Sequence, residues 1–213
     1  MAYFPLFVDL KGKRCLVVGG KRVALRKARA LAEYGGEVFA VAEVFCEGWE
    51  GWKGVKEPVL IRRRAVLADA DRMDLVICAA SDAVFHREMS RYCRERAILV
   101  NVADSKEESS FLFPALVRRK DVVLGISTGG NSPAASRYLR EEIDQRLPEN
   151  FGALVERLGS FRELVKETLP KQKEREEVFS RIFFSALEEG EVKEEMVRAL
   201  IQDYARMNTR DNR

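Results

Sequence analysis

Histidine is almost absent from this chain of 213 residues, in which His86 is the only one. A metal site built from several histidines is therefore excluded, and a Ser-His-Asp triad would have to use His86. This histidine lies beside Arg87 and Glu88 in a stretch with helical periodicity. We therefore expect it to lie on the surface of a helix.

Cysteine is also scarce, and its spacing does not match a metal or redox motif. The four cysteines are Cys15, Cys46, Cys78 and Cys93, and no two of them form a C-x-x-C pair. Cys15 and Cys78 fall within apolar runs, where free cysteine usually packs as a small hydrophobic residue. We expect no metal site made of protein side chains.

Long apolar runs and a strong charge bias are missing too. No run approaches the roughly 20 residues that span a bilayer, and the first ten residues lack the basic start and cleavage site of a signal peptide. The net charge of +3 is too small to indicate a nucleic-acid-binding protein. Hydrophobic residues make up 46% of the chain, which is enough for a buried core. The sequence predicts a cytoplasmic protein that binds neither membranes nor nucleic acid.

The most informative motif is an apolar run followed by two glycines and a helical pattern. Cys15–Val18 precedes Gly19-Gly20, and the helical pattern starts near Val23. Strand, glycine turn and helix open a dinucleotide-binding βαβ unit, whose helix N-terminus holds a pyrophosphate. In the G-x-G-x-x-G/A pattern the first glycine and Ala24 match, but Lys21 replaces the middle glycine. The Lys21 side chain either takes up space that the pyrophosphate needs or turns outward and neutralises the phosphates.

Apolar runs and helical patterns alternate along the first 113 residues, which predicts a doubly wound parallel sheet. The expected helices are one that starts near Val23 and one over about 82–96. Val23 is placed on the apolar face of the first helix, together with Ala24, Ala28, Leu31 and Ala32. The expected strands are Cys15–Val18, Val38–Val41, Val59–Ile61, Leu75–Ala79 and Leu99–Val102.

An acidic residue follows the second of these strands. Dinucleotide-binding domains usually place such a residue there to bind the adenosine ribose, and Glu43 is the candidate. The alternative is a solvent-exposed loop acid, which is the commoner role because this spacing is loosely defined. The segment 43–58 is expected to form a loop or an irregular helix.

Residues 114–147 contain a second combination of strand, glycine turn and helix. A strand is expected over 121–127, a turn over Thr128–Pro133 and a helix over 134–147. Ser132 is the expected N-cap of that helix, and Pro133 its first residue. The turn is a potential anion cradle, and the alternative is ordinary turn and cap chemistry without a ligand.

Residues 148–213 predict helices only. Apolar residues recur there at helical spacing, Leu169-Pro170 ends one helix and Gly190 separates two others. Such apolar stripes are far more often core than a cofactor site. We expect a helical C-terminal domain.

Several short segments occur along the chain in a specific order. They are Tyr3-Phe-Pro-Leu-Phe-Val-Asp-Leu10, Val17-Val-Gly-Gly20, Val23-Ala-Leu-Arg-Lys27, Asp74-Leu-Val-Ile77, Ala79-Ala-Ser-Asp82, Val100-Asn-Val-Ala-Asp104, Phe111-Leu-Phe-Pro-Ala115, Ile126-Ser-Thr-Gly-Gly-Asn-Ser-Pro133 and Ser136-Arg-Tyr-Leu-Arg140. Together these segments resemble the siroheme synthase family in its stand-alone precorrin-2 dehydrogenase and sirohydrochlorin ferrochelatase form. The resemblance extends over nearly the full length of the chain.

The resemblance implies an α/β protein with three parts. These are a Rossmann-like NAD-binding domain over 1–113, a small α/β central dimerisation and substrate region over 114–147 and a helical C-terminal domain over 148–213. It also implies a homodimer that uses NAD to oxidise precorrin-2 to sirohydrochlorin in siroheme biosynthesis. In some members of the family, ferrous iron is then inserted as a second substrate, and the macrocycle nitrogens bind it without a protein metal site.

The resemblance also implies roles for particular residues. Asp104 is the implied general base, and it follows an expected strand at the sheet edge where ligands bind; its alternative role is a strand-end cap. Basic side chains, Lys27 and Arg137 among them, are candidates to meet substrate carboxylates, with solvated helix faces as the alternative. The implied cofactor-binding residues are Gly19, Gly20, Lys21, Arg22, Val23, Ala24, Glu43 and Ser81, and the implied substrate-binding residues are Thr128, Gly129, Gly130, Asn131, Ser132 and Arg137.

Two other functions stay open. Lys21, Glu43 and His86 depart from the family pattern, which leaves room for a tetrapyrrole-binding carrier or chelatase on a Rossmann scaffold with impaired NAD binding. A nucleotide-sensing interaction module would require that the turn at Thr128–Pro133 has no tetrapyrrole role. Titration with NAD distinguishes the enzyme from the carrier, because the enzyme must bind NAD.

Overall fold

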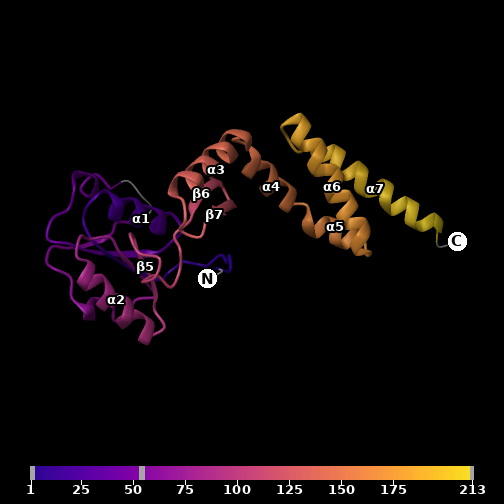
Figure 1. Ribbon diagram of the computed structural model, residues 1–213. Coiled ribbons are helices and arrows are strands. Elements are labelled where there is room, and N and C mark those ends of the chain that lie inside the picture. Colours follow the sequence, from indigo (N-terminus) through magenta and orange to yellow (C-terminus); the bar gives the residue numbers. More distant parts are fainter. Residues whose placement is uncertain (1–2, 53–55, 212–213) are drawn as a thin grey trace. The chain divides into compact units, whose positions relative to one another are not determined.

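The computed structural model describes residues 3–52 and 56–211, so part of the expected loop over 43–58 lies outside the described residues. The chain divides into two compact units (Figure 1). The first runs to Phe113 and includes Gly129–Asn131, and the second takes Pro114–Thr128 and continues from Ser132.

The first unit is built on a five-stranded parallel sheet with the order β3-β2-β1-β4-β5. The winding reverses between β1 and β4, so the carboxyl ends of these strands form the switch point at which α/β sheets bind ligands. The predicted strands and the Rossmann-like class are confirmed. The strands are β1 (Arg14–Val18), β2 (Glu37–Val41), β3 (Val59–Ile61), β4 (Leu75–Cys78) and β5 (Leu99–Val102).

Helices cover both faces of this sheet, with α1 (Arg22–Glu33) on one side and α2 (Ala83–Glu95) on the other (Figure 1). Two short 3-10 helices, η1 (Glu47–Trp49) and η2 (Leu67–Ala70), lie in the connections. Alternate residues of β1 enter different cores: Cys15 and Val17 pack with α1, whereas Leu16 and Val18 pack with α2. Burial on both faces explains why the strands are continuous apolar runs rather than alternating ones.

Two expectations about individual side chains are wrong. His86 is only 6% exposed, because it shares a helix face with Met89 and Cys93 at helical spacing and that face of α2 packs on the sheet. Val23 is 43% exposed although it was placed on the apolar face of the first helix, whereas Ala24 and the rest of that face are buried. Val23 lies in the first turn of α1.

The second unit begins with an antiparallel hairpin of β6 (Ala115–Arg119) and β7 (Val122–Ile126). β7 confirms the predicted strand over 121–127. β6 was not predicted, because its sequence ends in charged residues. After the glycine turn, α3 (Pro133–Arg146) starts as predicted, with the Ser132 hydroxyl accepting a hydrogen bond from the Ala135 N–H at 3.1 Å.

Four helices complete the second unit: α4 (Phe151–Gly159), α5 (Arg162–Thr168), α6 (Gln172–Glu189) and α7 (Glu194–Asp211). Their apolar stripes form one core around Val165, Val178, Ile182 and Val197, as expected. The α4 helix also packs against the hairpin, because Gly152 lies directly against the Arg119 carbonyl. The boundary at 147 and 148 stays a prediction. No helix in the described part of the chain is both long and apolar enough to cross a membrane.

Candidate functional site

The turn between β1 and α1 is fixed at the centre of the sheet's carboxyl edge. Gly19 has a φ of 129°, and a β-carbon there would lie 2.7 Å from the Ala79 carbonyl oxygen at the end of β4. Its N–H donates to the Val41 carbonyl of β2 at 2.9 Å, and a β-carbon on Gly20 would collide with the Val44 backbone. Both positions therefore require glycine for close backbone approach.

The N-terminus of α1 is open to an anion. Lys21 is the N-cap residue, its backbone is extended and its side chain makes no cap hydrogen bond. No acidic residue lies in the first turn, which contains Arg22, Val23 and Ala24. Helix N-termini carry unsatisfied N–H groups and a positive partial charge, so this end fits a pyrophosphate. The exposed Lys21 side chain adds a positive charge beside it.

The loop after β2 is anchored on the glycine turn. The Cys46 N–H and the Trp49 Nε1–H both donate to the Gly20 carbonyl at 2.9 Å, and the Trp49 side chain is buried. These bonds hold Glu43, which is exposed, at the carboxyl end of β2. Its position fits the ribose role, which stays a prediction.

Ser81 lies in the loop that joins β4 to α2, at the same edge of the sheet. It is exposed, and the Asp82 carboxylate after it caps α2 by accepting a hydrogen bond from the Phe85 N–H at 3.0 Å. That bond and the ion pair with Arg64 at 2.9 Å lower the pKa of Asp82. Asp82 therefore has a structural role as helix cap and ion-pair partner, whereas the Ser81 side chain is exposed to solvent.

Asp104 follows β5 at the same carboxyl edge and is exposed. Within the described ranges, no hydrogen bond or ion pair reaches its carboxylate. The end of β5 is held instead by its neighbours: the Ser105 N–H donates to the Val102 carbonyl at 3.2 Å, and the Ser109 hydroxyl accepts from the Val102 N–H at 2.9 Å. Since the strand end needs nothing from Asp104, the cap role has no support.

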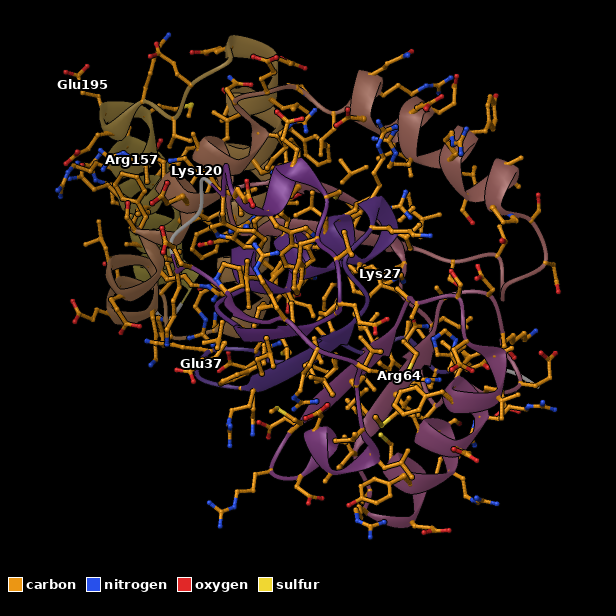
Figure 2. The ribbon with its side chains drawn as sticks, turned by 90° about the vertical axis from the view of Figure 1, so that its left-hand side faces the viewer. Lys27, Glu37, Arg64, Lys120, Arg157 and Glu195 are labelled. Carbon is orange, nitrogen blue, oxygen red and sulfur yellow. The ribbon has the colours of Figure 1, made fainter. Side chains whose placement is uncertain are left out.

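Lys27 is a site residue whose environment sequence reasoning missed. Figure 2 labels its side chain. It is only 8% exposed, its Nζ donates to Asn101 Oδ1 at 3.0 Å and it lies 4.3 Å from the centre of the Phe113 ring. The pKa of Lys27 is lowered to about 8, mainly by burial and to a smaller extent by the charge of Arg26, while the charge of Asp104 opposes both effects.

The solvated-face alternative for Lys27 is therefore wrong. A signal was present in the sequence, because Ala24, Lys27, Ala28 and Leu31 follow the helical spacing of one apolar face. A lysine within such a stripe either extends to the surface along its aliphatic stem or is buried with a partner. The sequence does not distinguish these outcomes, since the partner Asn101 lies 74 residues away.

His86 is a second buried basic group near this edge. Burial lowers its pKa, and the negative charges of Asp82 and Asp104 oppose that effect. Its Nε2 is buried and has no hydrogen-bond partner among the residues the structure describes. Burial thus favours the neutral imidazole, whose Nε2 is left without a hydrogen bond within the described structure.

The second predicted binding segment is the turn from Thr128 to Ser132. The Thr128 hydroxyl donates to the Ser132 carbonyl at 3.0 Å and lies 3.0 Å from the Ser136 hydroxyl, while Gly129 and Gly130 adopt positive φ of 65° and 80°. Turn and cap chemistry thus accounts for Thr128 and Ser132. Asn131 and Arg137 are exposed. Substrate binding by these six residues stays a prediction.

Residues 6–115 match the protein family described as "Putative NAD(P)-binding", which covers more than half of the chain. The chain belongs to this NAD(P)-binding family. The match begins before β1 and ends at the first residue of β6, so it includes the glycine turn, the loop after β2 and Asp104.

Curated relatives extend the similarity beyond this domain. The chain is 32% identical over 198 residues to a siroheme synthase of Vesicomyosocius okutanii, and 36% identical over 194 residues to one of Thioalkalivibrio sulfidiphilus. A siroheme synthase of Pseudomonas paraeruginosa is 35% identical over 197 residues. These alignments cover 91%, 91% and 92% of this chain but only 42%, 39% and 41% of the relatives. The chain thus spans about two fifths of their length.

A solved structure shares the fold over nearly the whole chain. It is SirC, a precorrin-2 dehydrogenase, with a TM-score of 0.71 and 21% sequence identity. The superposition covers 96% of this chain and all of that one. The combination of a parallel sheet, a hairpin and C-terminal helices is therefore shared.

Proposed function

We propose that the protein is a precorrin-2 dehydrogenase, which uses NAD to oxidise precorrin-2 to sirohydrochlorin in siroheme biosynthesis. The observation that carries this proposal is the position of Asp104, an exposed carboxylate without a partner in the described structure. It lies at the same sheet edge as the glycine turn of a NAD(P)-binding domain. Similarity to siroheme synthases and to the fold of SirC supports the choice of substrate.

The residues at the sheet edge fit a dinucleotide. The backbone around Gly19 and Gly20 and the uncapped start of α1 would hold the pyrophosphate, with Lys21 adding positive charge. Glu43 would bind the ribose, and Ser81 would lie beside the cofactor. When bound, the nicotinamide supplies a hydride acceptor.

Asp104 would remove the proton. Oxidation of precorrin-2 transfers one hydride to NAD and releases one proton, so the reaction needs a base near the macrocycle. A carboxylate without hydrogen-bond partners is available for that transfer and can afterwards release the proton to solvent. The same group would accept N–H protons if ferrous iron enters the macrocycle as a further substrate.

The predicted substrate-binding residues would bind the macrocycle, and the second unit would form the dimer. The turn from Thr128 to Ser132 and Arg137 would meet substrate carboxylates. The α3 helix packs on the hairpin, yet none of its residues is fully buried in the described chain, and Tyr138 and Leu139 are 61% and 43% exposed. This apolar surface supports a homodimer through the central region. Light scattering after size exclusion tests it, and Tyr138→Glu combined with Leu139→Glu should reduce the mass to that of a monomer.

One incubation tests the activity. The chain is mixed with precorrin-2 and NAD, and absorption spectra are recorded with and without ferrous iron. A dehydrogenase forms NADH and sirohydrochlorin together, and iron insertion then changes the macrocycle spectrum. A tetrapyrrole carrier would bind the macrocycle without forming NADH, and titration with NAD alone would show no binding.

A further inference from the structure

Lys27 is an unusual residue for the place it occupies. It lies in the core between α1 and the sheet, where the residues around it are apolar. A buried ammonium group is costly unless other groups compensate its charge. In the described structure its one hydrogen-bond acceptor is the neutral amide of Asn101, and no carboxylate lies within ion-pair distance. The Phe113 ring contributes only a cation–π contact.

The position of Lys27 on α1 directs its ammonium toward the site. Side chains on a helix lean toward its N-terminus, and the N-terminus of α1 lies at the carboxyl edge of the sheet. Asn101 of β5 pairs with Ile77 of β4, which belongs to the core beneath α1. Asp104 follows three residues after Asn101. The ammonium is thus directed toward the edge from which Asp104 extends.

Asn101 is itself held in one orientation. Its Nδ2 donates to the Phe111 carbonyl at 3.1 Å, so its Oδ1 remains free to accept from Lys27. Because the amide is fixed by its Nδ2, its Oδ1 holds the Lys27 ammonium in one position. This pair of hydrogen bonds joins α1, β5 and the segment after β5.

Two charged groups act on Lys27. Asp104 favours its charged form, and Arg26, the preceding residue of α1, opposes it. Cys15 of β1 lies in the same core, and burial raises the pKa of its thiol to about 12, so it carries no charge. Asp104 is therefore the anion toward which this buried cation is oriented.

We propose that Lys27 is a positioning residue of the dehydrogenase site, whose buried ammonium, held by Asn101, supplies the positive charge that Asp104 needs to act as a base beside a polyanionic substrate. This inference rests on the proposed function. The carboxylates of precorrin-2 repel a further anion in the site, and the ammonium offsets that repulsion. Asp104 takes the substrate proton, and Lys27 keeps its own proton throughout.

The pH profile gives the sharpest test. Lys27 carries its charge below a pKa of about 8 and loses it as the pH rises. For the parent chain we expect kcat to fall above about pH 8. Lys27→Arg keeps the charge at every pH used, because arginine does not deprotonate, so this fall should disappear. Lys27→Met lacks the charge and should lower kcat about tenfold or more below about pH 8, where the parent chain is charged at this position.

The measurement is NADH formation from precorrin-2 between about pH 6 and pH 10, with kcat and KM separated. Arg91→Met serves as the matched control, because it removes an exposed positive charge from the same unit. Thermal melting checks folding. If Lys27→Met does not fold, Lys27→Arg still tests the inference, because its pH profile of kcat shows whether the fall at alkaline pH has disappeared. Nitrogen NMR of the lysine side chains provides a readout without activity: Asp104→Asn should lower the pKa of Lys27.

The outcomes separate the two claims. A folded parent chain that does not oxidise precorrin-2 would overturn the proposed function and this inference with it. An active parent whose alkaline limb is the same in Lys27→Arg would overturn this inference alone. So would a folded Lys27→Met variant that turns over at the parent's rate.

Discussion

A β-carbon on Gly19 would lie 2.7 Å from the carbonyl oxygen of Ala79. This relationship joins the first turn of the dinucleotide motif to the end of β4, across the point where the winding of the sheet reverses. The Gly19 φ of 129° adds a second requirement for glycine. The turn is therefore specified by its neighbours as well as by the cofactor that it fits.

Gly19→Ala should destabilise the protein by about 1–3 kcal/mol, because strain at φ 129° is added to contact with a backbone that cannot move away. NAD binding should weaken as well, since the turn has to shift. Urea unfolding and NAD titration measure the two effects. Gly51→Ala is the control, because a β-carbon at Gly51 meets nothing within 4 Å. Equal stability of Gly19→Ala and the parent would contradict the strain argument.

Lys21→Gly should weaken NAD binding, most strongly at low salt. Its side chain is exposed beside an uncapped helix N-terminus, where a positive charge favours phosphate, and salt screens such interactions. Calorimetric titration at two salt concentrations measures the effect. Tighter binding by the glycine variant would instead show that this side chain occupies space that the pyrophosphate needs.

Local patterns in the sequence were sufficient to predict much of the first unit. The strands are continuous apolar runs because both faces of the sheet are covered, and Gly19-Gly20 marks the turn into α1. The hairpin strand β6 was missed because its sequence ends in Arg118-Arg119, and only pairing with β7 makes it a strand. Such pairing is a property of the folded chain.

The site was predictable only in part. Asp104 and the glycine turn follow strands, so their common edge follows from the parallel topology. The burial of Lys27 involves a partner far along the chain, Asn101, and the burial of His86 follows from the packing of α2 on the sheet. Charged neighbours in the sequence pointed to exposure of His86, but on a helix the adjacent residues face other directions.

His86 should make the parent chain less stable in acid. Burial lowers its pKa in the folded protein, so the unfolded chain binds a proton more readily. Stability that depends on the neutral imidazole is present above the unfolded pKa of about 6.5 and is lost as the pH falls below it. The difference in unfolding free energy between the parent and His86→Asn should therefore shrink or reverse between about pH 7 and pH 5. A difference that stays constant with pH would contradict this account.

Two substitutions of Thr128 should distinguish a structural role of the turn from a binding role. Thr128→Val removes the hydroxyl that donates to the Ser132 carbonyl, which should cost about 1 kcal/mol of stability. Thr128→Glu places a negative charge in the turn and should weaken tetrapyrrole binding, while NAD affinity stays nearly unchanged. Fluorescence titration with sirohydrochlorin and melting curves measure these effects. Unchanged sirohydrochlorin affinity in a folded Thr128→Glu variant would leave the turn with only its capping role.

Asp104→Asn should abolish most of the activity and leave the fold intact. No hydrogen bond or ion pair to its carboxylate occurs within the described residues, and the end of β5 is held by Ser105 and Ser109. The amide cannot accept the substrate proton, and a missing base typically costs about 10²–10⁴-fold in rate. Sirohydrochlorin formation from precorrin-2 is the measurement, with NAD titration and melting as checks on binding and folding. Glu88→Gln, which removes an exposed carboxylate of α2, is the matched control.

If Asp104 serves both chemical steps, any iron insertion should be lost together with oxidation, because both remove protons from the same macrocycle. A folded Asp104→Asn variant that oxidises precorrin-2 at the parent's rate would remove this carboxylate from the mechanism, and loss of folding would restore the strand-end cap.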